Sequence, residues 1–334
     1  TCTLSVMYRE KTKEGEIFGG PMYVIKNGLP KRMLPLAYFF ALAGMIGCLP
    51  AFQSNQLIQI TGDLAFSEIE NFNILGGLVL AGITGLVVIG GLKRIAEVAT
   101  FLVPLMGSIY FGAMLVALIL NLNLVLPAFK LIFIDAFNGT AIAGGTFFGV
   151  LIYGVRRGAF SNEAGMGTES LVHGVAKVSN PVKQGLVAMT GPIFDTLIIC
   201  TATALMILVS GVWETSSSQG VTLTAEAFSI LLGNFGGLIL FVCVICFGLS
   251  TIFTYSYYGA SCSRFLFGKF GMKFYIYLYI LSIFIYSIVP IDIAINIADG
   301  AFAMMAIPTL ISALWLAPKV MQASKIYFKL IDNN

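Results

Sequence analysis

The sequence predicts an all-α integral membrane protein with eight transmembrane helices. Apolar residues make up 58% of the 334 residues and charged residues only 10%, whereas an average soluble domain carries about 25% charged residues. Long apolar runs recur along the whole chain, each near the ~20 residues that cross a hydrocarbon core of about 30 Å. The basic residues also gather on one side of the topology that these runs define.

The eight expected spans follow one another as a single transmembrane domain, 1–334. The first is a span together with its interfacial ends, and the ranges are 33–60, 74–90, 98–120, 139–157, 185–211, 233–258, 274–290 and 293–318. Alternate loops then fall on opposite sides, and one side receives 18 of the 19 Lys and Arg residues. Because basic loops stay inside, both termini are expected to face the cytoplasm, in the inner or plasma membrane.

Several function classes are disfavoured by what the chain contains. Its single histidine, His173, falls in an expected cytoplasmic loop, so histidine catalysis within the membrane is excluded. The pair Cys243 and Cys246 lies on an uncharged helix and is interpreted as small core residues rather than a metal site. The net charge of +3 follows from topology and implies no nucleic-acid partner. An integral-membrane enzyme and a purely structural membrane protein are the disfavoured alternatives, and no cofactor is expected.

The fourth expected span contains a glycine-rich stretch near mid-membrane. Gly144, Gly145 and Gly149 surround the adjacent rings of Phe147 and Phe148. Glycine lowers the cost of unwinding a helix, and unwound backbone at membrane depth occurs where it lines a cavity or is packed in protein. Transporters use such broken helices to present backbone groups to substrates and ions. Close helix packing through small residues is the alternative interpretation.

The sixth expected span carries a group of hydroxyl side chains. Thr251 and Tyr255 are four residues apart and share a helix face, with Ser250 at its edge. Hydroxyl oxygens are hard ligands that suit a small alkali cation. Alternatively, these Ser and Thr hydroxyls bond to the preceding helical turn or join helices.

Polar residues also interrupt other spans. Pro50 is expected to bend the first span, and Gln53 and Asn55 follow within it. Amides at this depth either join helices or contact a ligand. Asp195 and Asp299 lie in the fifth and eighth spans, where a charge costs at least ~2.5 kcal/mol and therefore faces a cavity or a partner. Structural and transport roles remain open for both carboxylates.

Several stretches together resemble the sodium:alanine (alanine or glycine:cation) symporter family. The most specific runs from Arg157 to Gly167 and is similar to the family signature R-G-x-F-S-N-E-A-G-M-G. The others occur in the family's order over essentially the whole chain: Tyr8-Arg9-Glu10, Gly19-Gly20-Pro21-Met22-Tyr23, Asp195-Thr196, Cys200-Thr201, Ser256-Tyr257-Tyr258-Gly259 and Met305-Ala306-Ile307-Pro308.

The resemblance implies a LeuT-like architecture, with a five-plus-five inverted repeat and a site formed by core helices one, three, six and eight. The eight spans would be core helices three to ten. Core helix one is then expected to be absent from this chain, and the chain is expected to be N-terminally truncated. The segment from Phe160 to Gly167 is interpreted as a loop-to-helix cap near the inner gate.

The resemblance also implies roles for individual residues. Ser250 and Thr251 match the hydroxyl pair that coordinates sodium. The positions expected to line the amino-acid pocket are Gln53, Asn55, Phe147, Phe148, Gly149, Thr251 and Tyr255.

The expected function is alternating-access symport of a small neutral amino acid, alanine or glycine, with sodium, by a monomer in the lipid bilayer. Two departures from the family pattern, Leu49-Pro50 and Thr254-Tyr255, lie near the expected pocket and put alanine itself in question. The alternative is a LeuT-like transporter of another amino acid, or one driven by protons through Asp195.

Overall fold

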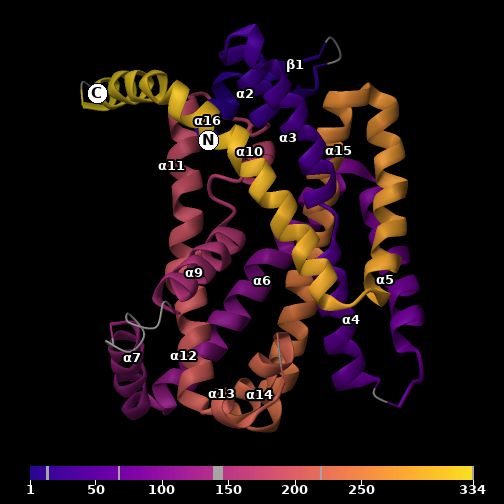
Figure 1. The fold of residues 1–334 in the computed structure, drawn as a ribbon, viewed down its shortest axis with the longest axis vertical. Helices are drawn as coiled ribbons and strands as arrows, with labels where there is room; N and C mark the ends of the chain where they lie inside the picture. Colours follow the sequence, from indigo (N-terminus) through magenta and orange to yellow (C-terminus); the bar gives the residue numbers. More distant parts are fainter. Residues whose placement is uncertain (13–14, 67, 138–145, 219, 333–334) are drawn as a thin grey trace.

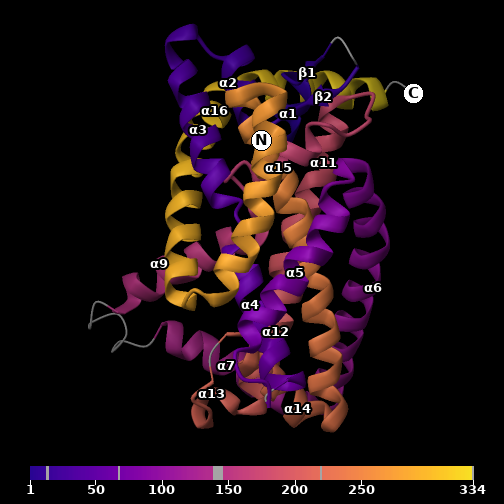
Figure 2. The same cartoon turned by 90° about the vertical axis from the view of Figure 1, so that its right-hand side faces the viewer.

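The computed structural model describes residues 1–12, 15–66, 68–137, 146–218 and 220–332 (Figure 1). Within these ranges the chain is almost entirely helical. The two described strands, β1 (Glu10–Lys11) and β2 (Ile17–Phe18), form a small antiparallel hairpin. This hairpin lies at the same end of the molecule as both termini, together with the short helices α1 (Cys2–Met7), α2 (Pro21–Gly28) and η1 (Lys31–Met33) (Figure 2).

The first expected span forms two helices, α3 (Leu34–Gly47) and α4 (Ala51–Ala65). The break falls at Leu49 and Pro50, where the sequence predicts a bend. Proline cannot donate a backbone hydrogen bond and its ring displaces the preceding turn. The break places the first turn of α4 inside a long apolar segment, so Gln53 lies close to a helix end rather than in the middle of a smooth helix.

The second and third spans correspond to α5 (Phe72–Val88) and α6 (Gly91–Leu120). The loop expected after the third span is wrong over most of its length, because α7 (Leu122–Ala136) occupies it. Asn121 has non-helical backbone angles and ends α6, after which the apolar residues start a second helix. Leu126 of α7 is 77% exposed.

The fourth expected span corresponds to α9 (Thr146–Asn162), which runs five residues beyond its expected end. The expected first part of this span, 139–145, lies outside the described residues, as do the side chains of Thr146 and Phe147. Only a short connection separates α9 from α10 (Thr168–His173).

The fifth span is continuously helical from Pro181 to Ser210, but the type of helix changes along its length. It consists of α11 (Pro181–Pro192), the π-helical η2 (Ile193–Cys200) and α12 (Thr201–Ser210). At the end of the molecule opposite the termini it leads into α13 (Val212–Thr215) and α14 (Val221–Leu232) (Figure 1).

The sixth and seventh spans are joined in one helical element, α15 (Asn234–Ile288). Its apolar part covers 54 residues, or about 80 Å at 1.5 Å per residue, which is far more than one bilayer crossing. Gly268 has φ 66° and ψ −156° and divides it into two halves that run in opposite directions (Figure 1). The expected loop over 259–273 is therefore wrong, since helix continues on both sides of this single glycine.

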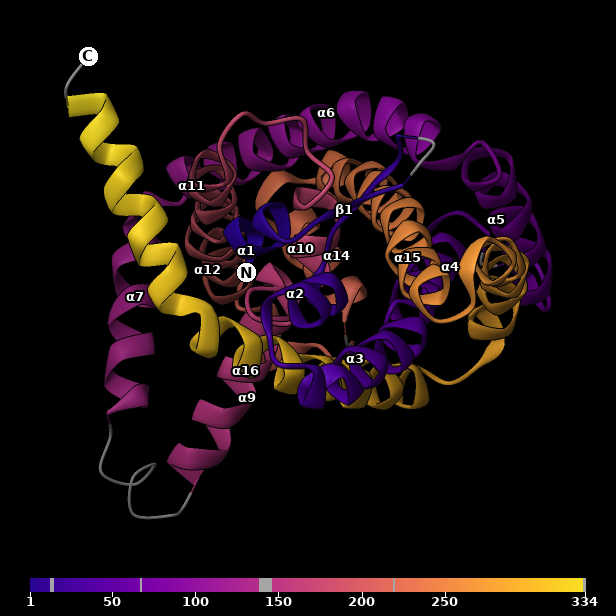
Figure 3. The same cartoon turned by 90° about the horizontal axis from the view of Figure 1, so that it is seen from above.

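The eighth span is α16 (Ile291–Asp332), which continues well beyond its expected end at residue 318. Pro308 and Pro318 lie inside it, and its C-terminal part points away from the bundle (Figure 3). Seen along the bundle, α5 and α6 lie on one side of the molecule and α3 and α16 on the other (Figure 3).

The interior and the outer surface of the bundle are both apolar. Phe40, Tyr275 and Tyr279 are among the largest fully buried side chains, whereas Leu314 on the outside is 76% exposed. Such an outside would be unfavourable in water but suits a hydrocarbon environment. Five helical segments of the described residues are long and apolar enough to cross a membrane, and α5 is a shorter apolar helix. The chain is therefore a multi-pass membrane protein.

Candidate substrate-binding site

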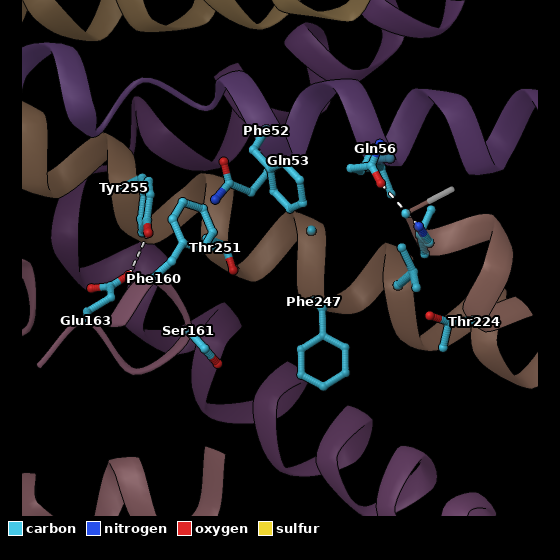
Figure 4. Close-up of a pocket in the computed structure, with 15 residues that line it drawn as sticks. Phe52, Gln53, Gln56, Phe160, Ser161, Glu163, Thr224, Phe247, Thr251 and Tyr255 are labelled. Atoms are coloured by element: carbon cyan, nitrogen blue, oxygen red, sulfur yellow. Dashed lines mark hydrogen bonds between the residues drawn. The ribbon is translucent and has the colours of Figure 1, made fainter. Parts of the chain in front are cut away.

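A cavity with both polar and apolar lining residues lies between α4, α14, α15 and the end of α9. It has a volume of about 480 Å³, within the usual range for small-molecule sites. Figure 4 shows the side chains around it. Its lining residues are Phe52, Gln53, Gln56, Leu57, Phe160, Ser161, Glu163, Gly220, Val221, Thr224, Val244, Phe247, Gly248, Thr251 and Tyr255.

The α15 wall bears the hydroxyl face that the sequence predicts. Thr251 and Tyr255 both line the cavity. Ser250 is buried beside them, and its hydroxyl donates to the backbone oxygen of Phe247 at 3.0 Å. Ser250 thus bonds to its own helix and also lines a second cavity described below, while Thr251 faces the main cavity.

Of the two α4 amides that the sequence analysis assigns to the pocket, Gln53 and Asn55, one lines the cavity and the other does not. Gln53 lines the cavity next to Thr251 (Figure 4). Asn55 instead donates its side-chain amide to the backbone oxygen of Val289 at 2.7 Å. It thereby ties α4 to the end of α15 and does not line the cavity. Gln56, the next residue, accepts from the backbone N–H of Val221 at 3.3 Å.

The aromatic cover of the cavity comes from residues that sequence reasoning missed. Phe148 is 68% exposed, and neither it nor Gly149 lines the cavity. The Phe160 ring instead makes edge contacts with Phe52 and Phe302, at centroid distances of 5.7 and 5.4 Å. Phe160 belongs to the family signature, and its position next to the predicted glycine-rich helix is the only sequence signal that pointed to it.

Glu163 is the second residue that the sequence analysis left out of the site. It follows the last residue of α9 and has φ 55°, an uncommon left-handed conformation for a residue other than glycine. The hydroxyl of Tyr255 donates to its Oε1 at 2.6 Å (Figure 4). Loss of contact with water raises the pKa of the Glu163 carboxyl, and the hydrogen bond from Tyr255 partly opposes this.

A second cavity of about 360 Å³ lies on the other side of this contact. The two cavities share Ser161, Glu163, Thr251 and Tyr255 in their walls. The hydrogen bond between Tyr255 and Glu163 therefore stands where the two cavities meet.

Asp195 lines the second cavity and is held by hydroxyl groups. Ser161 donates to its Oδ2 at 2.5 Å and Thr196 at 3.1 Å, and Asn162 donates to the Thr196 hydroxyl at 3.1 Å. The wider π-helical turn of η2 places the carboxylate opposite the end of α9, and such turns are frequent at functional sites. The signature segment and the fifth span are thus joined through Asp195.

Asp299 has a different partner. Its carboxylate pairs with the guanidinium of Arg157, which also lies over the rings of Tyr153 and Phe160 at 5.5 and 5.4 Å. This pair ties α9 to α16, a link that the sequence alone did not indicate.

The chemistry of the main cavity suits a zwitterion. Glu163 is the one charged side chain among its described lining residues, which otherwise offer amides, hydroxyls and aromatic rings. A carboxylate can pair with an ammonium group, and amides can donate to a carboxylate. Among the described residues there is no group of three His, Cys, Asp or Glu side chains that could hold a metal ion.

The fold is that of a multi-pass membrane protein with a cavity of small-molecule size between its helices. The sequence profile of the sodium:alanine symporter family matches residues 1–334. The chain belongs to this family, which is one of transporters and not of enzymes.

Individual relatives agree with this assignment. The chain is 38% identical over 328 residues to the "Uncharacterized transporter YflA" of Bacillus subtilis, covering 95% of this chain and 68% of that protein. It is 35% identical over 340 residues to the "Sodium/alanine symporter AgcS" of Methanococcus maripaludis, covering 99% and 74%. It is also 33% identical over 328 residues to the "Probable sodium/glutamine symporter GlnT" of Bacillus subtilis, covering 97% and 67%.

Proposed function

We propose that this protein takes up a small neutral amino acid together with sodium by alternating access. The observation that carries the proposal is the cavity in which Gln53, Thr251 and Tyr255 face Glu163. In this arrangement the substrate ammonium pairs with Glu163 and its carboxylate accepts from Gln53. Family membership and the name of the methanococcal relative support sodium and alanine.

Thr251 is the proposed protein ligand of the co-transported sodium, with Ser250 as its neighbour. Thr251 lines both cavities, so an ion beside it can reach the substrate and the Glu163 carboxylate. Binding of sodium then raises the affinity for the amino acid, and binding of the amino acid raises the affinity for sodium, as symport requires. The LeuT-like order of core helices three to ten and a monomeric state remain part of the proposal.

A second candidate is transport of a larger neutral amino acid. An aromatic ring at position 147 or 148 facing Tyr255 would restrict the site to small side chains, yet Phe148 is exposed and does not line the cavity. The relative whose name gives glutamine supports this alternative. Within this second candidate, protons could replace sodium as the coupling ion through Asp195, because Asp195 lines the second cavity.

Uptake in proteoliposomes separates these possibilities. Labelled alanine should accumulate with an inward sodium gradient, and glycine and serine should compete better than glutamine or leucine. Thr251→Ala should raise the sodium concentration for half-maximal uptake by about tenfold, as expected from the loss of one ligand interaction of about 1.4 kcal/mol. Ser250→Ala should raise it less, because Ser250 lines the second cavity alone whereas Thr251 lines both. Ser287→Ala, a buried serine of the second half of α15, is the matched control.

Three outcomes of these uptake experiments would contradict the proposal. Glutamine competing as well as alanine would establish the second candidate. Uptake that follows a proton gradient without sodium, and is lost in Asp195→Asn, would replace sodium by protons. An unchanged sodium requirement in Thr251→Ala would move the ion to another site.

The proposed orientation has its own test in intact cells. A cysteine at Glu226 in α14 should react with an impermeant thiol reagent, whereas one at Lys183 in α11 should not. The two positions lie on opposite sides of the predicted topology. The unsubstituted protein serves as the control because its own Cys200 is exposed. Labelling of Lys183→Cys from outside would reverse the proposed orientation.

A further inference from the structure

The aromatic rings at the main cavity come from four helices. Phe52 of α4, Phe160 of α9 and Tyr255 of α15 all line the cavity (Figure 4). Phe302 of α16 is buried next to them. Its ring makes edge contacts with Phe160 and Tyr255, at centroid distances of 5.4 and 6.3 Å. The position of the Phe160 ring therefore affects how much of the cavity a ligand can occupy.

Phe160 also has a charged neighbour on its own helix. Arg157 precedes it by three residues, so the two side chains lie on the same face of α9. The Arg157 guanidinium lies over the Phe160 ring at 5.4 Å. Because a cation over an aromatic face attracts the ring, the position of the guanidinium and the position of the ring are coupled.

The same spacing recurs on α16. Asp299 pairs with Arg157, and Phe302, three residues after Asp299, contacts Phe160. An ion pair and a ring pair thus join α9 to α16 about one helical turn apart. Two contacts in register resist rotation of α9 about its own axis, whereas the ring pair alone would permit it.

Asp299 is the carboxylate that holds Arg157 in this position. Among the described residues no second carboxylate forms an ion pair with this guanidinium, and its Nε is buried without a hydrogen-bond partner. Asp299 lies within the membrane-crossing part of α16. Loss of one partner leaves an unpaired charge that moves toward water. Removal of the Asp299 charge should therefore displace the guanidinium and the Phe160 ring with it.

We propose that Asp299, acting through Arg157, positions the Phe160 ring and thereby limits the size of the amino acid that the main cavity accepts. Neither Asp299 nor Arg157 lines the cavity, so both are positioning residues. The inference rests on the proposed function, because it takes the main cavity as the amino-acid site. It assigns to Phe160 the size restriction that Phe148 does not supply.

The test measures how well glutamine and glycine compete with alanine uptake in proteoliposomes. Asp299→Asn should strengthen competition by glutamine relative to glycine by about fivefold, which corresponds to the loss of one cation–π contact of about 1 kcal/mol. Asp299→Glu, which can restore the ion pair, should keep the original selectivity. The matched control is Asp292→Asn, which removes an exposed carboxylate from the first turn of the same helix and should also keep it.

A double variant guards against loss of folding. Arg157→Gln with Asp299→Asn removes both charges, so no unpaired charge remains and its Tm should stay close to that of the unsubstituted protein. It should show the same fivefold change in selectivity. In a Phe160→Leu background, Asp299→Asn should change selectivity no further, because the ring that it positions is gone.

Unchanged selectivity in the double variant, with or without a lower Tm, would show a purely structural ion pair and overturn the proposal. An undiminished effect of Asp299→Asn in the Phe160→Leu background would also overturn it, since Asp299 would then act by another route. Amino-acid binding, measured in parallel as a rise in Tm, separates this inference from the proposed function. If the unsubstituted protein neither binds nor takes up a neutral amino acid, both fail. Alanine uptake with unchanged selectivity refutes the inference alone.

Discussion

The two walls of the main cavity are built in different ways. The α4–α15 wall is part of the packed interior, where Tyr255 is 4% exposed and the Tyr279 hydroxyl donates to the backbone oxygen of Ile252 at 2.6 Å. The α9 wall has an outer surface of exposed side chains such as Tyr153. It is held at its C-terminal end by the pair of Arg157 with Asp299 and by the bond from Ser161 to Asp195.

This difference indicates which part of the site is a framework. A wall embedded in close packing cannot move without disturbing many neighbours. A wall held by a few polar contacts has fewer interactions to exchange, so motions that open a site are expected there. We infer that α4 and α15 fix the shape of the cavity and that α9 with Glu163 closes it.

The largest effect is expected from adding one methyl group to the packed wall. In Gly259→Ala the new Cβ would lie 2.1 Å from the Tyr275 hydroxyl oxygen. Tyr275 must then move and lose its 2.7 Å hydrogen bond to the backbone oxygen of Met45. The expected loss of stability is about 1–3 kcal/mol, measured as a lower Tm in detergent.

Gly154→Ala on α9 is the matched comparison. No atom lies within 4 Å of its added Cβ, so the better helix propensity of alanine should leave Tm unchanged or slightly higher. Equal destabilisation by both substitutions would contradict the difference between the walls.

The next effect concerns pH. Because the folded protein holds the pKa of Glu163 above its ordinary value of 4.5, it binds this proton more tightly than the unfolded chain does. The folded protein should lose stability as pH rises from 4.5 through the raised pKa, by at most about 1.4 kcal/mol per pH unit. Glu163→Gln, which keeps an acceptor for Tyr255, should flatten this part of the Tm–pH curve.

A Tm–pH curve with the same slope in Glu163→Gln would assign the pH dependence to other groups.

The smallest effects should separate the two amides of α4. Asn55→Ala removes the bond to Val289 and should cost about 1 kcal/mol of stability, seen as a lower Tm with little change in substrate affinity. Gln53→Ala should instead weaken alanine uptake and leave Tm nearly unchanged, because Gln53 lines the cavity. The reverse pattern would show that α4 presents its other face to the substrate.

Much of the molecule follows from the sequence alone. Composition and the length of the apolar runs identify a membrane protein, because a bilayer requires about 20 apolar residues per helix. The bend at Pro50 and the shared face of Thr251 and Tyr255 follow from local geometry, since proline lacks an N–H and residues four apart are neighbours on a helix. Helical geometry also argues against placing Gln53 and Asn55 in one pocket, because residues two apart on a helix point in different directions.

Other features depend on the tertiary structure. The single-glycine bend in α15 replaces an expected loop, because the helix can continue until Gly268 adopts a conformation open mainly to glycine. The roles of Phe160 and Glu163 depend on where the end of α9 meets α15, and no local pattern encodes that distance. The sequence thus determined the environment of the chain and the faces of its helices. Which faces meet was decided by long-range packing, because the contact from Tyr255 to Glu163 joins residues 92 positions apart.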